Sequence, residues 1–335
     1  MRPFTYTRAK DPSSATKELT GNPNAKFLAG GTNLLDLMKE DVERPSAVID
    51  ITTLNLTEIK PIAAGTNKGG ISLGGLGKNT DAANHPLIRQ NYPLLTQAIL
   101  AGASGQIRNM ATNGGNLLQR TRCPYFYELA MPCNKRAPES GCGALEGINR
   151  MHAIFGWSKK CVAVYPSDMA IALAALDAVV RVRNAAGQER IIPFADFHRL
   201  PGNTPQMDTN LAHGELITAI ELPQNKFADR SYYLKVRDRA SYAFALISVG
   251  AALEMSGNKI VQARIAMGGV AHKPWRALTA EQLLVGKEAT EANFKLAADA
   301  EMANAKPLEH NKFKVELGNR SIVLALQMAM NGGKA

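Results

Sequence analysis

The stretch Lys26-Phe27-Leu28-Ala29-Gly30-Gly31-Thr32-Asn33-Leu34 decides how the first part of the chain is interpreted. Apolar residues 25–29 predict a short strand, and residues 34–38 carry leucine and methionine at helical spacing. The two glycines between them allow a tight turn, from which backbone N–H groups at a helix start can bind phosphate. An ordinary strand-to-helix turn explains the pair equally well, because this turn lacks the full Gly-x-Gly-x-x-Gly pattern.

A second glycine-rich segment, Arg108-Asn109-Met110-Ala111-Thr112-Asn113-Gly114-Gly115-Asn116-Leu117, repeats these ingredients. It combines small residues with amide and hydroxyl donors and one arginine, whose forked guanidinium suits anions. Two such segments favour one shared anionic ligand over a pair of unrelated turns, although the turns stay an alternative.

The rest of the chain predicts an α+β protein of two domains, residues 1–224 and 225–335, divided by a composition shift near residues 223–228. In the first domain we expect strands at 46–51, 70–76, 179–183 and 189–192, and helices at 93–100 and 169–176, the latter with Ser167 as its N-cap. In residues 120–160 the periodicity fades, and prolines and glycines predict a long irregular loop, after which regular structure resumes at 161–164. In the second domain we expect three strands, at 232–236, 243–254 and 260–267. Helices at 281–284 and 292–303 are expected to cover this sheet.

Composition excludes several classes of protein. The 335 residues carry 39 Lys+Arg against 29 Asp+Glu, a net charge of +10 that favours anionic ligands or acidic partner surfaces. The basic residues form short groups without a long run, so we expect no nucleic-acid binding. Residues 1–10 are followed by no apolar region, and the apolar stretch 169–180 is too short for a bilayer, which predicts neither a signal peptide nor a membrane span.

Cysteine is confined to one part of the chain: the only four are Cys123, Cys133, Cys142 and Cys161. A zinc finger or ribbon normally contains a close C-x(2-4)-C pair, which is missing here. Two disulfides would suit an exported protein, but a chain of this size needs none. Four thiolates from an irregular loop also match one iron–sulfur cluster, which the spacing favours while disulfides, free thiols and zinc stay open.

The remaining chemical groups give weaker signals. Six histidines are scattered without metal-ligand spacing or a neighbouring nucleophile motif, so each is interpreted as a surface or core residue. Lys235 in the second domain either reaches a ligand or is a solvated charge on a strand.

In its two glycine-rich segments and at residues 166–168, the sequence resembles the FAD-binding medium subunits of the xanthine dehydrogenase family of molybdenum hydroxylases. The resemblance covers nearly the whole chain. The resemblance implies an FAD-binding domain in two parts, of the vanillyl-alcohol-oxidase type, followed by a smaller domain with a three-stranded sheet and helices, of the CO dehydrogenase flavoprotein type. Residues 26–34 and 107–117 match the two pyrophosphate loops of the family, and Pro166-Ser167-Asp168 matches the segment whose aspartate contacts the flavin. The resemblance thus implies FAD contacts from Lys26, Phe27, Leu28, Ala29, Gly30, Gly31, Thr32, Asn33, Leu34, Arg108, Thr112, Gly115, Asn116 and Asp168, and, on weaker motifs, from Ile217 and Lys235.

The segment at about 120–161 is an insertion that most members of the family lack. It is similar to the insertion in flavin subunits of bacterial periplasmic aldehyde oxidoreductases, which implies that Cys123, Cys133, Cys142 and Cys161 hold one [4Fe-4S] cluster. A related insertion in the medium subunit of 4-hydroxybenzoyl-CoA reductase leaves the substrate open, and a zinc- or disulfide-stabilised binding protein without enzymatic activity is the rival from another class.

The resemblance further implies a heterotrimer. A large subunit would hold the molybdenum cofactor and oxidise an aldehyde, a small subunit would carry two [2Fe-2S] clusters, and this chain would pass electrons through FAD to an external acceptor. No catalytic residue is then expected in this chain. We expect the complex in the periplasm, exported on the signal of a partner, with the cytoplasm as the alternative.

Overall fold

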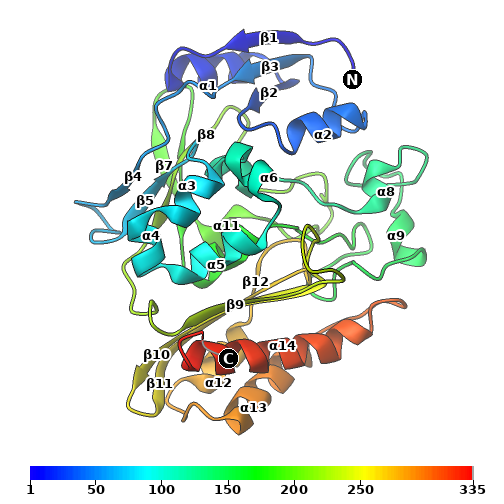
Figure 1. Ribbon diagram of the computed structural model, residues 1–335. Helices are drawn as coiled ribbons and strands as arrows, with labels where there is room; N and C mark the ends of the chain where they lie inside the picture. Colours follow the sequence, from blue (N-terminus) through cyan, green and yellow to red (C-terminus); the bar gives the residue numbers. More distant parts are fainter. Residues whose placement is uncertain (334–335) are drawn as a thin grey trace.

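Three β-sheets, one above the other in Figure 1, organise the chain, which a computed structural model describes over residues 1–333. The uppermost sheet is parallel, with β3 between β1 and β2. Helix α1 begins with a capping box, in which the Asp11 side chain accepts from the Ser14 N–H and the Ser14 hydroxyl accepts from the Asp11 N–H. The elements of this unit are β1 (Thr5–Arg8), α1 (Pro12–Gly21), β2 (Ala25–Leu28), α2 (Leu34–Lys39) and β3 (Ala47–Asp50).

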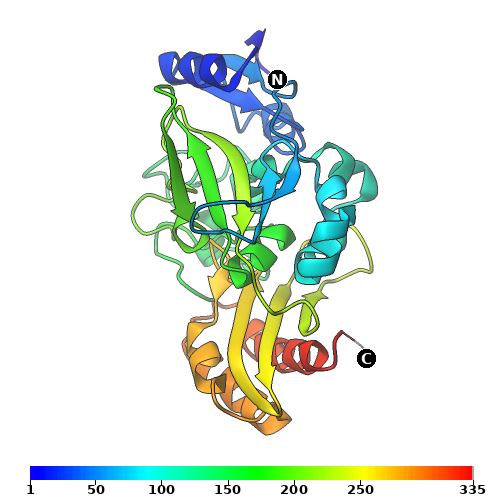
Figure 2. The ribbon, with the colours of Figure 1, turned by 90° about the vertical axis from the view of Figure 1, so that its left-hand side faces the viewer.

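The central sheet is antiparallel, in the order β4-β5-β8-β6-β7. Its middle strand β8 is buried over all seven residues. The rotated view in Figure 2 shows this sheet beside helices that lie between β5 and β6 in the sequence. The elements are β4 (Ile59–Pro61), β5 (Ile71–Gly74), α3 (Asn79–Asn84), α4 (Pro86–Asn91), α5 (Pro93–Ala101), α6 (Gly105–Met110), α7 (Asn113–Leu117), α8 (Pro124–Tyr127), α9 (Gly143–Glu146), α10 (Asp168–Ala175), β6 (Val179–Arg183), β7 (Glu189–Pro193), α11 (Phe194–Phe197) and β8 (Leu216–Leu222).

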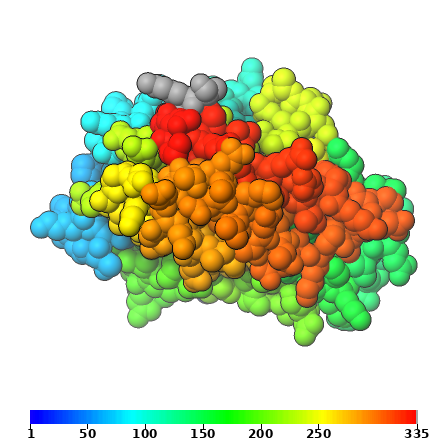
Figure 3. All heavy atoms as spheres, turned by 90° about the horizontal axis from the view of Figure 1, so that it is seen from below, coloured from blue at the N-terminus to red at the C-terminus, as the bar shows by residue number. Residues whose placement is uncertain are grey.

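The third sheet is antiparallel, in the order β12-β11-β10-β9, and helices cover one of its faces. Figure 3, seen from below, shows the atoms of these helices forming the outer surface of that end. The elements are β9 (Ser231–Val236), β10 (Ile247–Ser256), β11 (Lys259–Gly268), β12 (Trp275–Arg276), α12 (Leu278–Leu284), α13 (Glu291–Met302) and α14 (Phe313–Met330).

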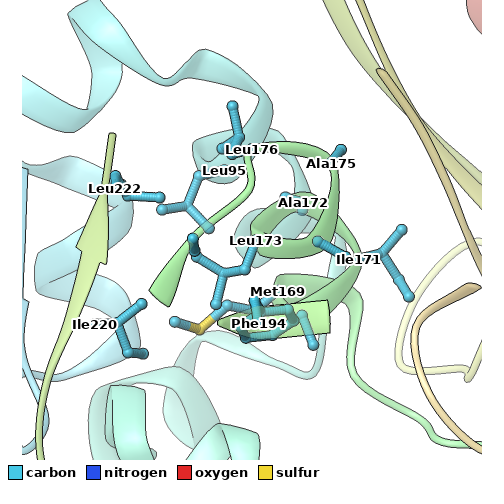
Figure 4. Close-up of a cluster of buried hydrophobic side chains, with 14 of the residues drawn as sticks. Leu95, Met169, Ile171, Ala172, Leu173, Ala175, Leu176, Phe194, Ile220 and Leu222 are labelled. Carbon is cyan, nitrogen blue, oxygen red and sulfur yellow. The ribbon is translucent and has the colours of Figure 1, made fainter. Parts of the chain in front are cut away.

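Helix α10 lies at the centre of the largest hydrophobic core. All eight of its residues are buried, as expected for a helix that is apolar on every side. Figure 4 shows its side chains among those of α5, β8 and α11, and the same core reaches Ala252 and Ala266 in the third sheet. Because α10 is fixed on all sides, the residue that begins it, Asp168, has a fixed position as well.

The structure confirms the α+β class and corrects several predicted elements. The sheet of the second domain has four strands instead of three, because β12 spans two residues and is too short to produce a pattern. Helix α14 was not predicted, since it runs through Gly318, Asn319 and Ser321, which have low helix propensity. Residues 161–164 form no strand beyond a single bridge between Cys161 and Ser158.

Residues 120–160 are irregular as predicted, with only the one-turn helices α8 and α9. Across the described part of the chain, the structure contains no helix with the length and apolar character needed to cross a bilayer.

Candidate cofactor-binding site

Two hollows meet at the glycine loops. The N-terminal hollow lies between the uppermost sheet and the start of β8, and the central hollow lies between α5, α6, α10 and the loop that joins β9 to β10. Both are lined by Thr32, Asn33 and Gly115. Together they form one long depression, which suits an extended ligand with the two glycine loops at its middle.

The first glycine loop is shaped by contact with the second. Gly31 has a φ of +72°, which favours glycine over other residues. A side chain at Gly30 would overlap the backbone carbonyl of Met110, so the loops can approach this closely only because Gly30 lacks one. The two segments that the sequence paired on chemical grounds are therefore in direct contact.

The second loop is fixed by a buried polar network. Its Thr112 hydroxyl caps α7 by accepting from the Gly115 N–H at 3.1 Å. Asn113 Nδ2 donates to the carbonyl of Gly74, and Asn116 Nδ2 donates to Asn79 Oδ1 at 2.9 Å. These bonds hold the backbone of the loop in place before any ligand binds.

Asn33 provides a direct test of whether the site fits a phosphate-containing cofactor. Its Oδ1 accepts from the backbone N–H of Arg120, whereas its buried Nδ2 has no hydrogen-bond partner within residues 1–333. A buried donor without a partner is unfavourable, and a ligand rich in oxygen atoms would satisfy it. The glycine contact, the fixed loop and this free donor fit the FAD expected from the sequence.

The two domains meet in the central hollow through an ion pair. Lys235 Nζ on β9 lies 2.8 Å from Asp168 Oδ2 and donates to the carbonyl of Ala101, while the Tyr233 hydroxyl donates to Asp168 Oδ1 at 2.6 Å. Burial raises the pKa of Tyr233 well above its usual value, which keeps the phenol protonated. Since the Lys235 side chain is only 5% exposed, it is part of the site and not a solvated strand charge.

The structure gathers nearly all the FAD contacts proposed from the sequence around the two hollows. Leu28, at the end of β2, lines neither hollow. The central hollow is lined by Arg108, Asn116, Asp168 and Lys235, and the N-terminal hollow by Lys26, Phe27, Ala29, Gly30, Gly31, Leu34, Thr112 and Ile217.

Sequence reasoning missed two further parts of the lining. The loop between β9 and β10 contributes Tyr242 and Phe244 to the central hollow, together with Asp238 and Arg239. The basic pair at 237 and 239 was visible in the sequence, but nothing there showed that it faces the first domain.

The other missed part is a group of charged residues beside the N-terminal hollow. Arg120 lies 2.6 Å from Glu43 and 2.8 Å from Asp208, and Lys135 of the cysteine segment also contacts Asp208. Desolvation alone would raise the pKa of Asp208, but the two cations bring it down to about 2. These four residues tie the cysteine segment to the hollow, and their wide separation in sequence left no local signal.

All four cysteines line one small cavity, and all are free thiols. Cys133 and Cys142 face each other in an isolated bridge, and Cys161 belongs to the bridge with Ser158. Burial raises the pKa of Cys123 to about 12 and that of Cys161 to about 11, so these thiols are inert unless a metal displaces their protons. Among the described residues, no three His, Cys, Asp or Glu side chains are arranged to hold a single metal ion.

Comparison with known protein families assigns both parts of the chain. Residues 2–225 match the FAD binding domain in molybdopterin dehydrogenase, and residues 232–325 match the CO dehydrogenase flavoprotein C-terminal domain. The chain belongs to the FAD-binding medium subunits of the molybdenum hydroxylase family. It is therefore an FAD-binding oxidoreductase subunit.

Individual relatives agree with this assignment. The chain is 49% identical to the aldehyde oxidoreductase FAD-binding subunit PaoB of Escherichia coli (strain K12), over 98% of this chain and 99% of the relative. It is 32% identical to the glyceraldehyde dehydrogenase medium chain of Sulfolobus acidocaldarius, over 85% of this chain and 82% of the relative.

Solved structures share the fold at lower identity. Quinoline 2-oxidoreductase of Pseudomonas putida 86 superposes with a TM-score of 0.76 at 23% identity, covering 99% of this chain and 98% of that one. Carbon monoxide dehydrogenase of Hydrogenophaga pseudoflava gives the same TM-score at 24% identity, covering 99% of both chains.

Proposed function

We propose that this chain is the FAD- and [4Fe-4S]-carrying electron-transfer subunit of a heterotrimeric, molybdenum-dependent aldehyde oxidoreductase. The observation that carries the cluster is the cavity lined by all four cysteines, in a segment joined to the N-terminal hollow by partly buried charges. The aldehyde class rests on the relative at 49% identity, which is named an aldehyde oxidoreductase subunit.

The donor set of the cysteine cavity fits a cluster better than a single ion. A lone zinc ion needs its ligands to converge on one point, and no described group of three does so. In a [4Fe-4S] cluster each cysteine binds a different iron, so four sulfurs spread around a cavity are the appropriate arrangement. Free thiols in the structure also argue against a disulfide framework.

The role of this chain is to position its cofactors and set their surroundings. When bound, FAD would exchange electrons singly and in pairs, and the cluster would exchange them singly. The glycine loops and Asn33 would hold the pyrophosphate, while Asp168 and Lys235 fix the wall of the central hollow across the domain boundary. The four cysteines, of which Cys133 and Cys161 are buried and the other two partly exposed, would hold the cluster.

Partner subunits and compartment complete the proposal. A large molybdenum-cofactor subunit would bind the aldehyde, and a small subunit would carry two [2Fe-2S] clusters. We place the complex in the periplasm by export on the signal of a partner. Fractionation of cells that express the three subunits tests this, because activity confined to the cytoplasm would contradict it.

The cluster is tested by replacing one ligand. Cys133→Ser in the full complex is expected to abolish iron binding by this chain while leaving FAD bound, because the glycine loops are separate from the cysteine cavity. Met131→Ser changes an exposed residue of the same segment and should leave iron unchanged. Zinc in place of iron, or iron retained by Cys133→Ser, would refute the assignment.

The substrate class is tested separately by assay of the assembled heterotrimer. Aldehyde oxidation with an artificial electron acceptor is expected. Reduction of an aromatic acyl-CoA by a low-potential donor, without aldehyde oxidation, would instead support the 4-hydroxybenzoyl-CoA reductase class.

A further inference from the structure

One histidine touches a cysteine of the cavity. His152 Nε2 lies 3.1 Å from the sulfur of Cys123, and the side chain is buried. A sulfur bound to iron is a thiolate and can only accept a hydrogen bond, so in the loaded protein Nε2 must carry the hydrogen. The buried Nδ1 has no partner in the described structure, which leaves the contact with Cys123 as the only side-chain bond that orients the ring.

The backbone of His152 is held from the far end of the chain. Asn311 Nδ2 donates to the carbonyl of His152 at 3.1 Å, and Lys314 Nζ donates to the same carbonyl at 3.0 Å. Asn311 lies two residues before α14 and Lys314 lies in its first turn, at the end of the helix that in Figure 1 is nearer to the segment with α9. The helical layer of the second domain thus fixes the backbone of the residue that contacts Cys123.

Lys314 is itself unusual. Its side chain is completely buried, and its only hydrogen-bond acceptors within residues 1–333 are the carbonyls of His152 and Gly269, the latter at 2.7 Å. Burial without a carboxylate partner lowers the pKa of Lys314 to about 7, so its ammonium form is favoured only when a compensating negative charge lies nearby. An iron–sulfur core is positively charged, but its four thiolate ligands give the whole cluster a net negative charge. A cluster in the cysteine cavity would therefore supply the negative charge that favours protonated Lys314.

Reduction adds one more negative charge to such a cluster. A hydrogen bond to a ligand sulfur and a protonated Lys314 held against the backbone of His152 both stabilise the reduced form more than the oxidised form. Their combined effect is to raise the reduction potential of the cluster.

We propose that His152 and Lys314 set the reduction potential of the cluster, His152 by donating a hydrogen bond to Cys123 and Lys314 as a buried positive charge that also positions His152. This inference rests on the cluster of the proposed function. It goes beyond it by naming residues outside the ligand set that decide when the cluster accepts an electron.

The test is a redox titration of the assembled holoenzyme, with the cluster followed by EPR. His152→Phe removes the donor, and Lys314→Met removes the charge at nearly constant length. We expect each to shift the potential downward by about a tenfold change in the ratio of oxidised to reduced cluster, which is about 59 mV for a one-electron couple. His152→Gln can place an amide N–H near the same sulfur and should restore most of the shift.

The matched control is Lys312→Met, which removes an exposed lysine two residues away on the same end of α14 and should leave the potential unchanged. Unchanged potentials in His152→Phe and Lys314→Met would overturn the inference while leaving the cluster in place. If His152→Phe fails to fold, Lys314→Met and His152→Gln decide. A wild-type chain without iron and sulfide would overturn the proposed function itself, and this inference with it.

Discussion

Gly30 and Gly31 show how much of the FAD site depends on single residues. Gly31 is needed for its positive φ, and Gly30 for the contact with Met110 that brings the two loops together. Sequence analysis singled out both glycines because a glycine pair between a strand and a helix is a local signal. It did not identify Met110 as the neighbour, since that contact joins segments eighty residues apart.

Gly30→Ala is predicted to abolish tight FAD binding. The added methyl group overlaps a backbone carbonyl that cannot rotate away, so the loops must separate, at a cost of roughly 1–3 kcal/mol in folding free energy. Gly21→Ala, where a side chain meets no atom, serves as the control. The ratio of flavin to protein after purification measures the effect, and full flavin content in Gly30→Ala would contradict the account of the loops.

His198 and His272 make the stability of the protein sensitive to mild acid. Burial lowers the pKa of each to about 4, whereas the unfolded chain protonates near 6.5. The unfolded state therefore binds more protons between these values, and the free energy of unfolding falls as the pH drops from about 6.5 to 4, by up to about 3 kcal/mol for each residue.

Thermal unfolding at several pH values tests this expectation. The melting temperature of the wild-type chain should fall between pH 7 and pH 5, and the fall should be smaller in His198→Gln, which can keep the bond to the Leu117 carbonyl without titrating. His213→Gln replaces an exposed histidine and should behave as wild type. A melting temperature independent of pH over this range would show that the buried histidines are not neutral.

Helix α10 connects folding to the cofactor site at the scale of elements. Its N-cap, Ser167, accepts from the Ala170 N–H at 3.0 Å and donates to Asn116 Oδ1 at 2.6 Å. The same side chain thus begins the central helix and fixes the second glycine loop. The N-cap was predicted from the sequence because it is a local feature, whereas the bond to Asn116, fifty-one residues away, was not.

Ser167→Ala is predicted to weaken both folding and FAD binding. Loss of an N-cap destabilises a helix by about 1 kcal/mol. Thr290→Ala removes the equivalent cap of α13, which lines neither hollow, and should lower stability to a similar extent without changing the dissociation constant of FAD. Equal FAD affinity in the two variants would show that the bond to Asn116 is not needed.

Elements with a strong local pattern were predicted well, and those shaped by tertiary packing were not. Strand β6 was predicted with its observed bounds because its valines and arginines alternate. Strand β8, buried on both faces, has no alternation and was missed. In α14, Gly318 packs against Met302, and a side chain at this position would overlap that methionine. The contact explains why a glycine occurs inside the helix, although its low helix propensity kept the helix from being predicted.

At the scale of the whole molecule, charged residues join the cysteine cavity to the N-terminal hollow, and no local sequence pattern reveals these contacts. Lys135 of the cysteine segment and Arg120 share Asp208, and Arg120 also pairs with Glu43 beside the N-terminal hollow. The four clustered cysteines and the two glycine loops could each be identified from the sequence. How the two are connected required the structure.

Lys135→Met is predicted to weaken FAD binding severalfold, although Lys135 lines only the cysteine cavity. Without the positive charge of Lys135, Asp208 keeps only Arg120 as an ion-pair partner. The position of Arg120, which lines the N-terminal hollow, is then less firmly fixed. Lys160→Met breaks an exposed ion pair with Glu139 in the same segment and should have no effect, because such pairs contribute little. Titration of the apoprotein with FAD measures both, and identical affinities would mean that the network does not link the sites.

The most direct test of the central claim is the quantification of flavin, iron, sulfide and zinc in the purified wild-type chain, with its EPR spectrum after reduction. The account predicts about one FAD, four irons and four sulfides per chain, with the signal of a reduced [4Fe-4S] cluster. Flavin without iron and sulfide, or zinc bound by the four cysteines, would contradict it.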